Sequence, residues 1–342
     1  MSLQATSGAA TAGRPRGGVD LGGTKIQAVV VDDADTVLGS AREPTPETGG
    51  PADVAAAMVT TMTRAAQAAG VATSDLAGVG VGSPGTIDAA AGTVSNAGNL
   101  PNWEGSFALA DALAQPLGTR VLLDNDVTVA TNAEFRLGAG RPYQSLLGVF
   151  WGTGVGGGLV LDGRPWHGRG AAGEIGHMVV EVGGRRCTCG RQGCMEAYAG
   201  RLAMEIRARE TVAKGRKTVL FKIMEERGRT RLSSGVWARA LEQEDKLAAH
   251  LIDRAVEALG AGIASAINIL DVEAVVIGGG MGLRLGDSYV RWIADAMMPH
   301  LFVDERPPAV HLAALGDLGG AIGAALLVSD AAAERQGEAA TR

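Results

Sequence analysis

The stretch GGVDLGGTKIQAVVVDD, residues 17–33, contains two apolar runs separated by Gly22 and Gly23. Runs rich in Val and Ile on either side of a glycine pair are typical of two antiparallel strands joined by a tight turn. A third apolar run near residues 36–41 predicts a returning strand. The chain therefore begins with a predicted three-stranded meander.

After the meander, strand-like and helix-like patterns alternate. Residues 52–69 have helical composition and end at Gly70, and most of 195–270 also predicts helices. Short apolar runs of strand length occur at 76–81, 120–123, 146–151, 158–161, 274–277 and 309–314, and an alanine-rich helix is predicted over 317–328. This order indicates an α/β protein built from two related halves.

The composition is that of a globular protein with an excess of glycine, which accounts for 51 of the 342 residues. The stretch at residues 145–161 has no charged residue but contains several glycines, which argues against a membrane-spanning helix. A net charge of −6 argues against binding to nucleic acid or anionic lipid, because both need clustered Lys and Arg. Residues 1–16 lack the apolar block of a secretory signal, so we expect a disordered tail and a cytoplasmic protein.

Three glycine clusters each follow an apolar run. They are Gly22-Gly23-Thr24-Lys25, Gly152-Thr153-Gly154 and Gly278-Gly279-Gly280. Glycine lets several backbone N–H groups approach one anion, so each cluster is either a phosphate-binding loop or simply a tight turn. The G-x-G-x-x-G matches at 80–85 and 152–157 lack the helix that a dinucleotide site requires, and the sequence has no P-loop motif. The clusters suggest a nucleotide held between two lobes.

An acid pair follows another predicted strand. Asp124, Asn125 and Asp126 come after the apolar run at 120–123 and directly before a helical stretch. A carboxylate at this position either caps the helix or acts as a general base that accepts a proton from a substrate hydroxyl during phosphoryl transfer. The sequence pattern leaves both interpretations open.

All three cysteines lie close together and follow a histidine. His177, Cys187, Cys189 and Cys194 occur in the order H-x9-C-x-C-x4-C. One imidazole and three thiols suit a closed tetrahedral zinc site, which would brace a loop and leave no open position for water. An odd number of cysteines argues against a disulfide framework, and buried thiols without a metal are the alternative.

Two glutamates flank this cluster. Zinc binding would fix Glu174, His177 and Glu196 relative to one another. Rigidly held polar groups suit a polyhydroxylated ligand, because each sugar hydroxyl both donates and accepts hydrogen bonds, although the same groups would also suit mere support of the metal. Farther along, residues 201–231 have a local excess of Lys and Arg, which indicates either a solvated helical face or a surface that attracts an anionic substrate.

These motifs resemble those of the ROK family, which includes repressors and sugar kinases, and in particular its bacterial glucokinases. The resemblance covers roughly residues 18–328 and rests on DLGGTK at 20–25, GTGVGGG at 152–158, GEIGHMVVE at 173–181 and CTCGRQGCMEAYAG at 187–200. It implies an actin-like, ribonuclease-H-like α/β fold of two lobes with a cleft for nucleotide and sugar. The small lobe would comprise 17–125 plus 317–330, the large lobe 126–316 with the zinc site, and 331–342 a second disordered tail.

The resemblance also implies roles for single residues. Asp126 would be the general base, and Asp20 would hold Mg²⁺. The sugar would contact Gly85, Asn99, Asn125, Asp126, Glu174, His177 and Glu196. The nucleotide would contact Asp20, Gly22, Gly23, Thr24, Lys25, Gly152, Thr153, Gly154, Gly278, Gly279 and Gly280, and zinc would bind His177, Cys187, Cys189 and Cys194.

The activity that the resemblance implies is ATP-dependent phosphorylation of the 6-hydroxyl of glucose, with Mg²⁺ and a structural Zn²⁺. The alternatives are a kinase for fructose, mannose or N-acetylmannosamine, the use of polyphosphate as donor, and a non-catalytic sugar-sensing repressor. About sixteen residues before the first strand are too few for a helix-turn-helix domain. We expect a homodimer or homotetramer with no nucleic-acid or membrane partner.

Overall fold

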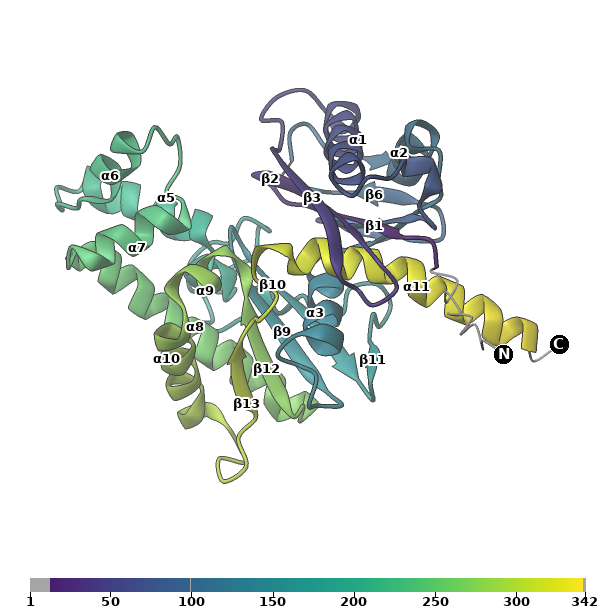
Figure 1. The fold of residues 1–342 in the computed structure, drawn as a ribbon. Helices are drawn as coiled ribbons and strands as arrows, with labels where there is room; N and C mark the ends of the chain where they lie inside the picture. Colours follow the sequence, from purple (N-terminus) through teal and green to yellow (C-terminus); the bar gives the residue numbers. More distant parts are fainter. Residues whose placement is uncertain (1–12, 99, 341–342) are drawn as a thin grey trace, which may run out of the picture. The chain divides into compact units, whose positions relative to one another are not determined.

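The structure, a computed structural model, describes residues 13–98 and 100–340, with the backbone alone described over 333–340. The chain forms two compact units (Figure 1). Unit 1 comprises Met1–Asp126 and Gly320–Arg342, and unit 2 comprises Val127–Gly319. The sequence analysis places the lobe boundaries at 125/126 and 316/317, whereas the two units of the structure meet at 126/127 and 319/320.

Unit 1 contains a five-stranded sheet in the order β3-β2-β1-β4-β8. Its strands are β1 (Arg16–Leu21), β2 (Lys25–Val31), β3 (Val37–Pro44), β4 (Val79–Ser83) and β8 (Val121–Asn125). The first three strands pair antiparallel, which confirms the predicted meander, whereas β4 and β8 extend the sheet in parallel.

Unit 2 repeats this arrangement with the order β11-β10-β9-β12-β13. Its strands are β9 (Leu146–Trp151), β10 (Val155–Leu161), β11 (Arg164–Pro165), β12 (Ala274–Gly278) and β13 (Ala309–Leu312). Again the first three strands in sequence pair antiparallel and the last two extend the sheet in parallel. Equal strand order and equal directions agree with the expectation of two related halves.

A second, three-stranded sheet in unit 1 was not predicted. It contains β5 (Thr86–Asp88), β6 (Thr93–Ser95) and β7 (Ser106–Phe107). Strands of two or three residues are too short to show an alternating apolar pattern, and they lie in a segment rich in Gly, Asn and Pro. The G-x-G-x-x-G matches at 80–85 and 152–157 lead into the strands β5 and β10, and neither opens a helix.

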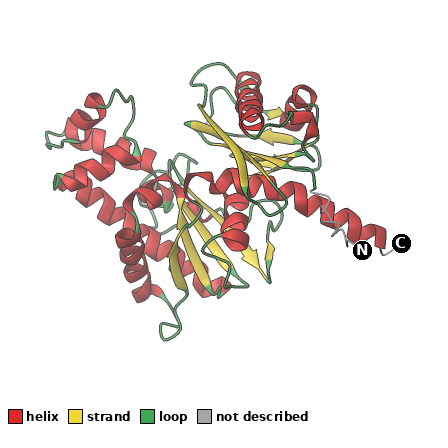
Figure 2. Cartoon of the chain, in the orientation of Figure 1, coloured by secondary structure: helices red, strands yellow, loops and turns green. Residues whose placement is uncertain are grey.

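Glycines in the unit 1 sheet let a helix pack directly against the strand backbone. The helices of this unit are α1 (Pro51–Ala68), α2 (Leu109–Leu117) and α11 (Gly319–Ala340), which Figure 2 shows beside the strands. A Cβ atom on Gly18 would lie 2.0 Å from the carbonyl oxygen of Ala321, and one on Gly80 would lie 1.7 Å from that of Ala324. Any side chain at these two positions would push α11 off the sheet.

The C-terminal helix is longer than the sequence analysis predicted. The structure continues α11 through Ala340, beyond the expected start of a disordered tail at 331. The physical reason is composition, because AAAERQGEAA consists mainly of strong helix formers. At the other end, residues 13–16 belong to the described part, and Arg14 donates to the carbonyl oxygens of Ser74 and Asp75. Residues 1–12 and 341–342 lie outside the described residues.

The helices of unit 2 lie on both faces of its sheet. They are α3 (Asp126–Leu137), α4 (Glu196–Ala199), α5 (Arg201–Ala213), α6 (Leu220–Glu226), α7 (Ser234–Glu242), α8 (Lys246–Leu270), α9 (Gly279–Leu285) and α10 (Asp287–Met297). Leu147 and Val149 of β9 are buried in the cluster that includes α8, whereas Leu146 is buried beside Phe135 of α3. Within the described part of the chain, no helix is both long and apolar enough to cross a membrane.

A buried carboxylate on α3 holds the segment that leads toward α11. Glu134 is 2% exposed. Its carboxylate accepts hydrogen bonds from the backbone N–H groups of Ala139, Ala314 and Leu315, at 3.0, 3.0 and 2.8 Å. These bonds fix the turn after β13 against α3.

Replacing Glu134 with Ala should lower the free energy of unfolding by on the order of 2 kcal/mol, because three backbone N–H groups lose an ionised acceptor. Urea unfolding followed by circular dichroism measures this change. The control is Glu257→Ala, which removes an exposed glutamate and should change the free energy by less than about 0.5 kcal/mol. Equal effects of the two substitutions would contradict the structural role of Glu134.

Candidate functional site

The first glycine cluster forms the turn between β1 and β2. The N–H of Gly22 donates to the carbonyl oxygen of Lys25 at 2.9 Å, and the hydroxyl of Thr45 donates to the carbonyl oxygen of Gly22 at 2.6 Å. Gly23 and Thr24 are exposed at the tip of this turn. The sequence thus produces a fixed turn whose tip is open to a ligand.

Asp20, the expected Mg²⁺ ligand, lies on β1 immediately before this turn. Gly320 of α11 lies against it, since a Cβ atom on Gly320 would be 2.7 Å from the Asp20 carboxyl carbon. The helix therefore approaches the carboxylate closely because residue 320 has no side chain.

The second and third glycine clusters lie next to each other in unit 2. Because β9 and β12 are parallel neighbours, the loops that follow them meet at the same edge of the sheet. A Cβ atom on Gly279 would lie 2.5 Å from the carbonyl oxygen of Trp151, and one on Gly152 would lie 4.0 Å from the nitrogen of Gly280. The third cluster differs from a simple turn, because β12 ends at Gly278 and α9 begins at Gly279.

The predicted base lies at the carboxyl edge of the unit 1 sheet. Strand β8 ends at Asn125, and Asp126 is the first residue of α3. Gly85 follows the neighbouring strand β4; its φ is +94°, and a Cβ atom there would lie 2.6 Å from the carbonyl oxygen of Ser95. Only glycine fits this position. Asn99, another expected sugar contact, lies outside the described residues.

The four predicted metal ligands come together as the metal cluster His177, Cys187, Cys189 and Cys194. One ligand atom from each lies within 4.8 Å of all the others. The sulfur atoms of Cys189 and Cys194 are 3.7 Å apart, and that of Cys187 is 3.8 Å from Nδ1 of His177. A tetrahedral zinc with bonds of about 2.3 Å to sulfur sets its ligand atoms about 3.8 Å apart, so this donor set fits zinc.

The thiols of the metal cluster differ in acidity. Burial raises the pKa of Cys187 to about 12. Burial acts in the same direction on Cys189, but hydrogen bonds from the Arg191 backbone and from Cys187 outweigh it and lower the pKa of Cys189 to about 7. Without a cation the cluster therefore keeps protons at neutral pH, and a divalent metal would displace them on binding.

The predicted sugar ligands of unit 2 are His177, which belongs to the metal cluster, and two glutamates next to it, Glu174 and Glu196. His177 directs Nδ1 toward Cys187, while its Nε2 lies 3.9 Å from Oε2 of Glu174. The side chain of Glu174 is 63% exposed and that of His177 is 32% exposed, so both are accessible to a ligand. The structure thus brings an exposed carboxylate and an imidazole edge together.

Glu196 connects the metal cluster to the second glycine cluster. Its Oε2 accepts a hydrogen bond from the N–H of Val155 at 3.0 Å, and its Oε1 lies 3.7 Å from the sulfur of Cys187. A Cβ atom on Gly154 would lie 2.2 Å from Oε2 of Glu196. The carboxylate therefore reaches the loop backbone only because residue 154 is glycine.

Sequence reasoning missed the role of Arg201, which it counted only as part of the basic segment. Arg201 donates from Nη2 to the hydroxyl of Thr153 at 2.8 Å. Burial lowers the pKa of Arg201, yet a guanidinium remains protonated at neutral pH. The sequence signal for this role is the place of Arg201 directly after the CTCGRQGCMEAYAG motif, which ends at Gly200.

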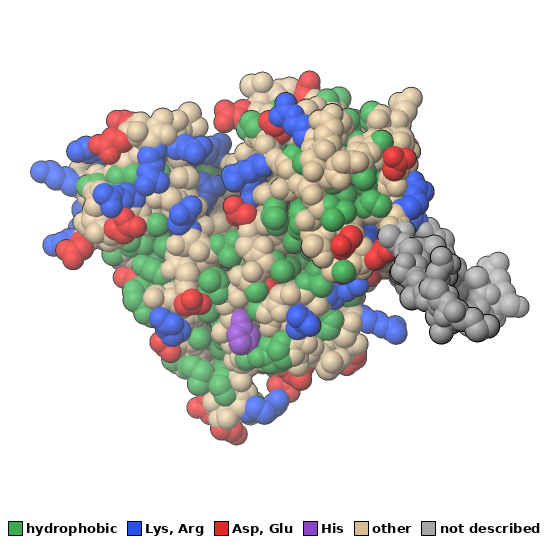
Figure 3. All heavy atoms as spheres, in the orientation of Figure 1, with side chains coloured by type: hydrophobic (Ala, Val, Ile, Leu, Met, Phe, Trp, Pro, Cys, Tyr) green, Lys and Arg blue, Asp and Glu red, His purple; other side chains and the backbone are tan. Residues whose placement is uncertain are grey.

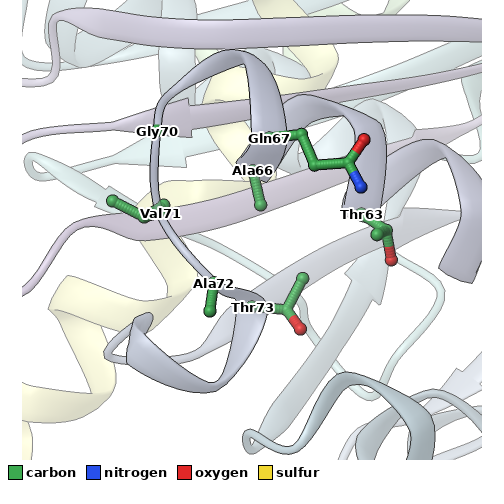
Figure 4. Close-up of a pocket in the computed structure, with 7 residues that line it drawn as sticks. All are labelled: Thr63, Ala66, Gln67, Gly70, Val71, Ala72 and Thr73. Atoms are coloured by element: carbon green, nitrogen blue, oxygen red, sulfur yellow. The ribbon is translucent and has the colours of Figure 1, made fainter.

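Two other surface features contain none of the predicted site residues. A pocket in unit 1 is lined by the end of α1 and the turn after it (Figure 4): Thr63, Ala66, Gln67, Gly70, Val71, Ala72 and Thr73. None of these seven residues is charged or belongs to the predicted site. In unit 2, Lys and Arg side chains gather over the region of α5 and α6 (Figure 3), where Lys214, Arg216, Lys217 and Arg227 are exposed.

The metal cluster predicts a measurable zinc content. The purified protein should contain about one equivalent of zinc, and Cys194→Ser should lose it, because three ligands hold the metal less tightly than four. Elemental analysis after dialysis measures the content. The control Thr188→Ala alters a neighbour of the ligands and should keep the metal. Zinc retained in Cys194→Ser would show that this thiol is no ligand.

Comparison with known proteins identifies the family. The family model described as "ROK family" matches residues 16–331. The chain is 34% identical to glucokinase of Thermotoga maritima over 79% of this chain and 83% of that protein, and 32% identical to N-acetyl-D-glucosamine kinase of Salmonella gallinarum over 91% and 98%. A solved ROK family glucokinase from Streptomyces griseus, in complex with glucose and AMPPNP, is 30% identical with a TM-score of 0.77, covering 92% of this chain and 98% of that one. With its two α/β units, this chain belongs to the ROK family.

Proposed function

We propose that this ROK protein, an ATP-dependent sugar kinase, transfers the γ-phosphoryl group of ATP to the 6-hydroxyl of glucose. The observation that carries the proposal lies in unit 2, where Glu196 contacts both the metal cluster and the loop after β9. A sugar-binding group and a phosphate-binding loop are thereby fixed to each other. The glucokinase names of two similar proteins support glucose as the acceptor.

The sugar side of the proposal rests on Glu174 and His177. An ionised carboxylate accepts hydrogen bonds from sugar hydroxyls, and an imidazole N–H donates one. Zinc, when bound by the metal cluster, would supply rigidity only, because four protein ligands leave no position for substrate. The cluster would thus hold His177 in one orientation, which favours one arrangement of sugar hydroxyls.

The phosphate side rests on the loops at Gly22–Thr24 and Gly152–Gly154. Backbone N–H groups at such loops bind phosphate oxygens and favour the charge that develops on the transferred group. Mg²⁺, bound with ATP and held by Asp20, would neutralise part of the phosphate charge.

In the proposed step, Asp126 accepts the proton of the sugar 6-hydroxyl. The oxygen then forms a bond to the γ-phosphorus, the bond from that phosphorus to the ADP oxygen breaks, and the products are glucose 6-phosphate and ADP. As the first residue of α3, Asp126 lies at a helix N-terminus, where the helix dipole stabilises an ionised carboxylate. An ionised carboxylate is the form that a general base requires.

Asp126→Asn should reduce kcat by about 10³-fold, because the amide cannot accept the hydroxyl proton. Calorimetry should still detect glucose binding, since the amide keeps the size of the carboxylate. The control Asp124→Asn changes the neighbouring acid of the pair and should reduce kcat by less than about tenfold. A near-normal kcat for Asp126→Asn would exclude this residue as the base.

A second candidate acceptor is N-acetylglucosamine, because the Salmonella kinase named for that sugar matches nearly the whole chain. A coupled assay with glucose, N-acetylglucosamine, mannose, fructose and N-acetylmannosamine, each with ATP or polyphosphate, tests the choice. We expect kcat/KM for glucose with ATP to exceed that of every other combination by at least about tenfold, a difference of about 1.4 kcal/mol in transition-state binding. A higher kcat/KM with another sugar or with polyphosphate would show that glucose and ATP are not the preferred substrates.

A further inference from the structure

Arg201 lies at the start of α5 and holds the loop between β9 and β10 at several points. Its Nη2 donates to the hydroxyl oxygen of Thr153 at 2.8 Å. The backbone N–H of Arg201 donates to the carbonyl oxygen of Gly152 at 3.1 Å. The backbone N–H of Leu202 donates to the carbonyl oxygen of Thr153 at 3.0 Å. Side chain and backbone of the helix start therefore contact the same loop.

The other end of the guanidinium is fixed as well. Nη1 of Arg201 donates to the carbonyl oxygen of Leu232 at 2.8 Å, and the N–H of Leu232 donates to Oε2 of Glu205 at 2.9 Å. Leu232 is fully buried, and Glu205 is 5% exposed. A planar guanidinium held at both ends has one orientation, so the direction of its bond to Thr153 is fixed.

The direction of this hydrogen bond decides what the Thr153 hydroxyl does. A guanidinium only donates, so the hydroxyl oxygen must accept from Arg201. The hydroxyl hydrogen then points away from the arginine and is offered to another acceptor. Phosphate oxygens only accept hydrogen bonds at neutral pH, so a hydroxyl fixed as a donor suits a phosphate group.

We infer that Arg201 is a positioning residue that fixes the Thr153 hydroxyl as a hydrogen-bond donor to a phosphate group of ATP. The inference rests on the proposed function, which assigns this loop to the nucleotide, and adds a residue outside the predicted nucleotide-binding set. Arg201 acts through Thr153 and need not contact the nucleotide.

A double-mutant cycle tests this inference. Arg201→Met should raise the KM for ATP about tenfold and leave the KM for glucose within about twofold, because a charge-assisted hydrogen bond to phosphate is lost or misdirected. Thr153→Val should have a similar effect. The double variant should be no worse than Thr153→Val alone, because Arg201 has nothing left to orient.

Three further variants serve as controls. Thr153→Ser keeps the hydroxyl and should retain nearly wild-type KM for ATP. Arg201→Lys keeps one positively charged donor but lacks the second guanidinium nitrogen, which binds Leu232. Its KM for ATP should therefore lie between those of the wild type and Arg201→Met. Arg207→Met removes another cation of α5, which pairs with Glu210 and not with Glu205, and should change the KM for ATP by less than about twofold.

The outcomes separate the inference from the proposed function. Absence of sugar phosphorylation by the wild-type protein would overturn the proposed function. Calorimetric titration with ATP would then test the role of Arg201, with a rise of about tenfold in the Kd for ATP expected in Arg201→Met. The inference would be overturned by an unchanged KM for ATP in Arg201→Met. It would also be overturned if the increases in KM for ATP of the two single variants multiplied in the double variant. If Arg201→Met does not fold, Arg201→Lys alone and combined with Thr153→Val provides the same cycle.

Discussion

The chemistry of unit 2 depends on the two contacts that the carboxylate of Glu196 makes, one with the β9–β10 loop and one with the metal cluster. One carboxylate oxygen accepts a hydrogen bond from the N–H of Val155 at the start of β10. The other lies 3.7 Å from the sulfur of Cys187 in the metal cluster. Each segment alone is a short irregular loop, and loops of this kind need external partners to hold one conformation. Glu196 supplies that partner to both, and Arg201 fixes the same β9–β10 loop from α5.

The glycine excess has two physical origins. Some glycines form the loops assigned to phosphate binding, as the sequence suggests. Others lie within strands and let a helix contact the sheet, as Gly18 and Gly80 do beneath α11 and as Gly148 and Gly158 do beneath Thr131 of α3. In both units the strand in the third place of the order, β1 or β9, carries one of these glycines, Gly18 or Gly148.

Much of the fold and of the candidate site was predictable, because the deciding residues are close in sequence. The β1–β2 hairpin is marked by its glycine pair, and the metal ligands lie within one segment, so their chemistry alone indicates zinc. Contacts between distant segments left no such signal. The bond from Arg201 to Thr153 spans 48 positions, and the bonds of Glu134 to Ala314 and Leu315 span even more. The helix α11 extends past its predicted end at residue 328 because helix-forming residues continue to Ala340.

The most direct test of this account is the kinetic effect of Glu196→Gln, measured separately with glucose and with ATP as the varied substrate. The amide keeps the size of the side chain but loses the charge and one acceptor. If Glu196 fixes both segments, the KM for glucose and the KM for ATP should each rise by about fivefold or more. A rise confined to glucose, with ATP unaffected, would contradict the claim that this carboxylate couples the two.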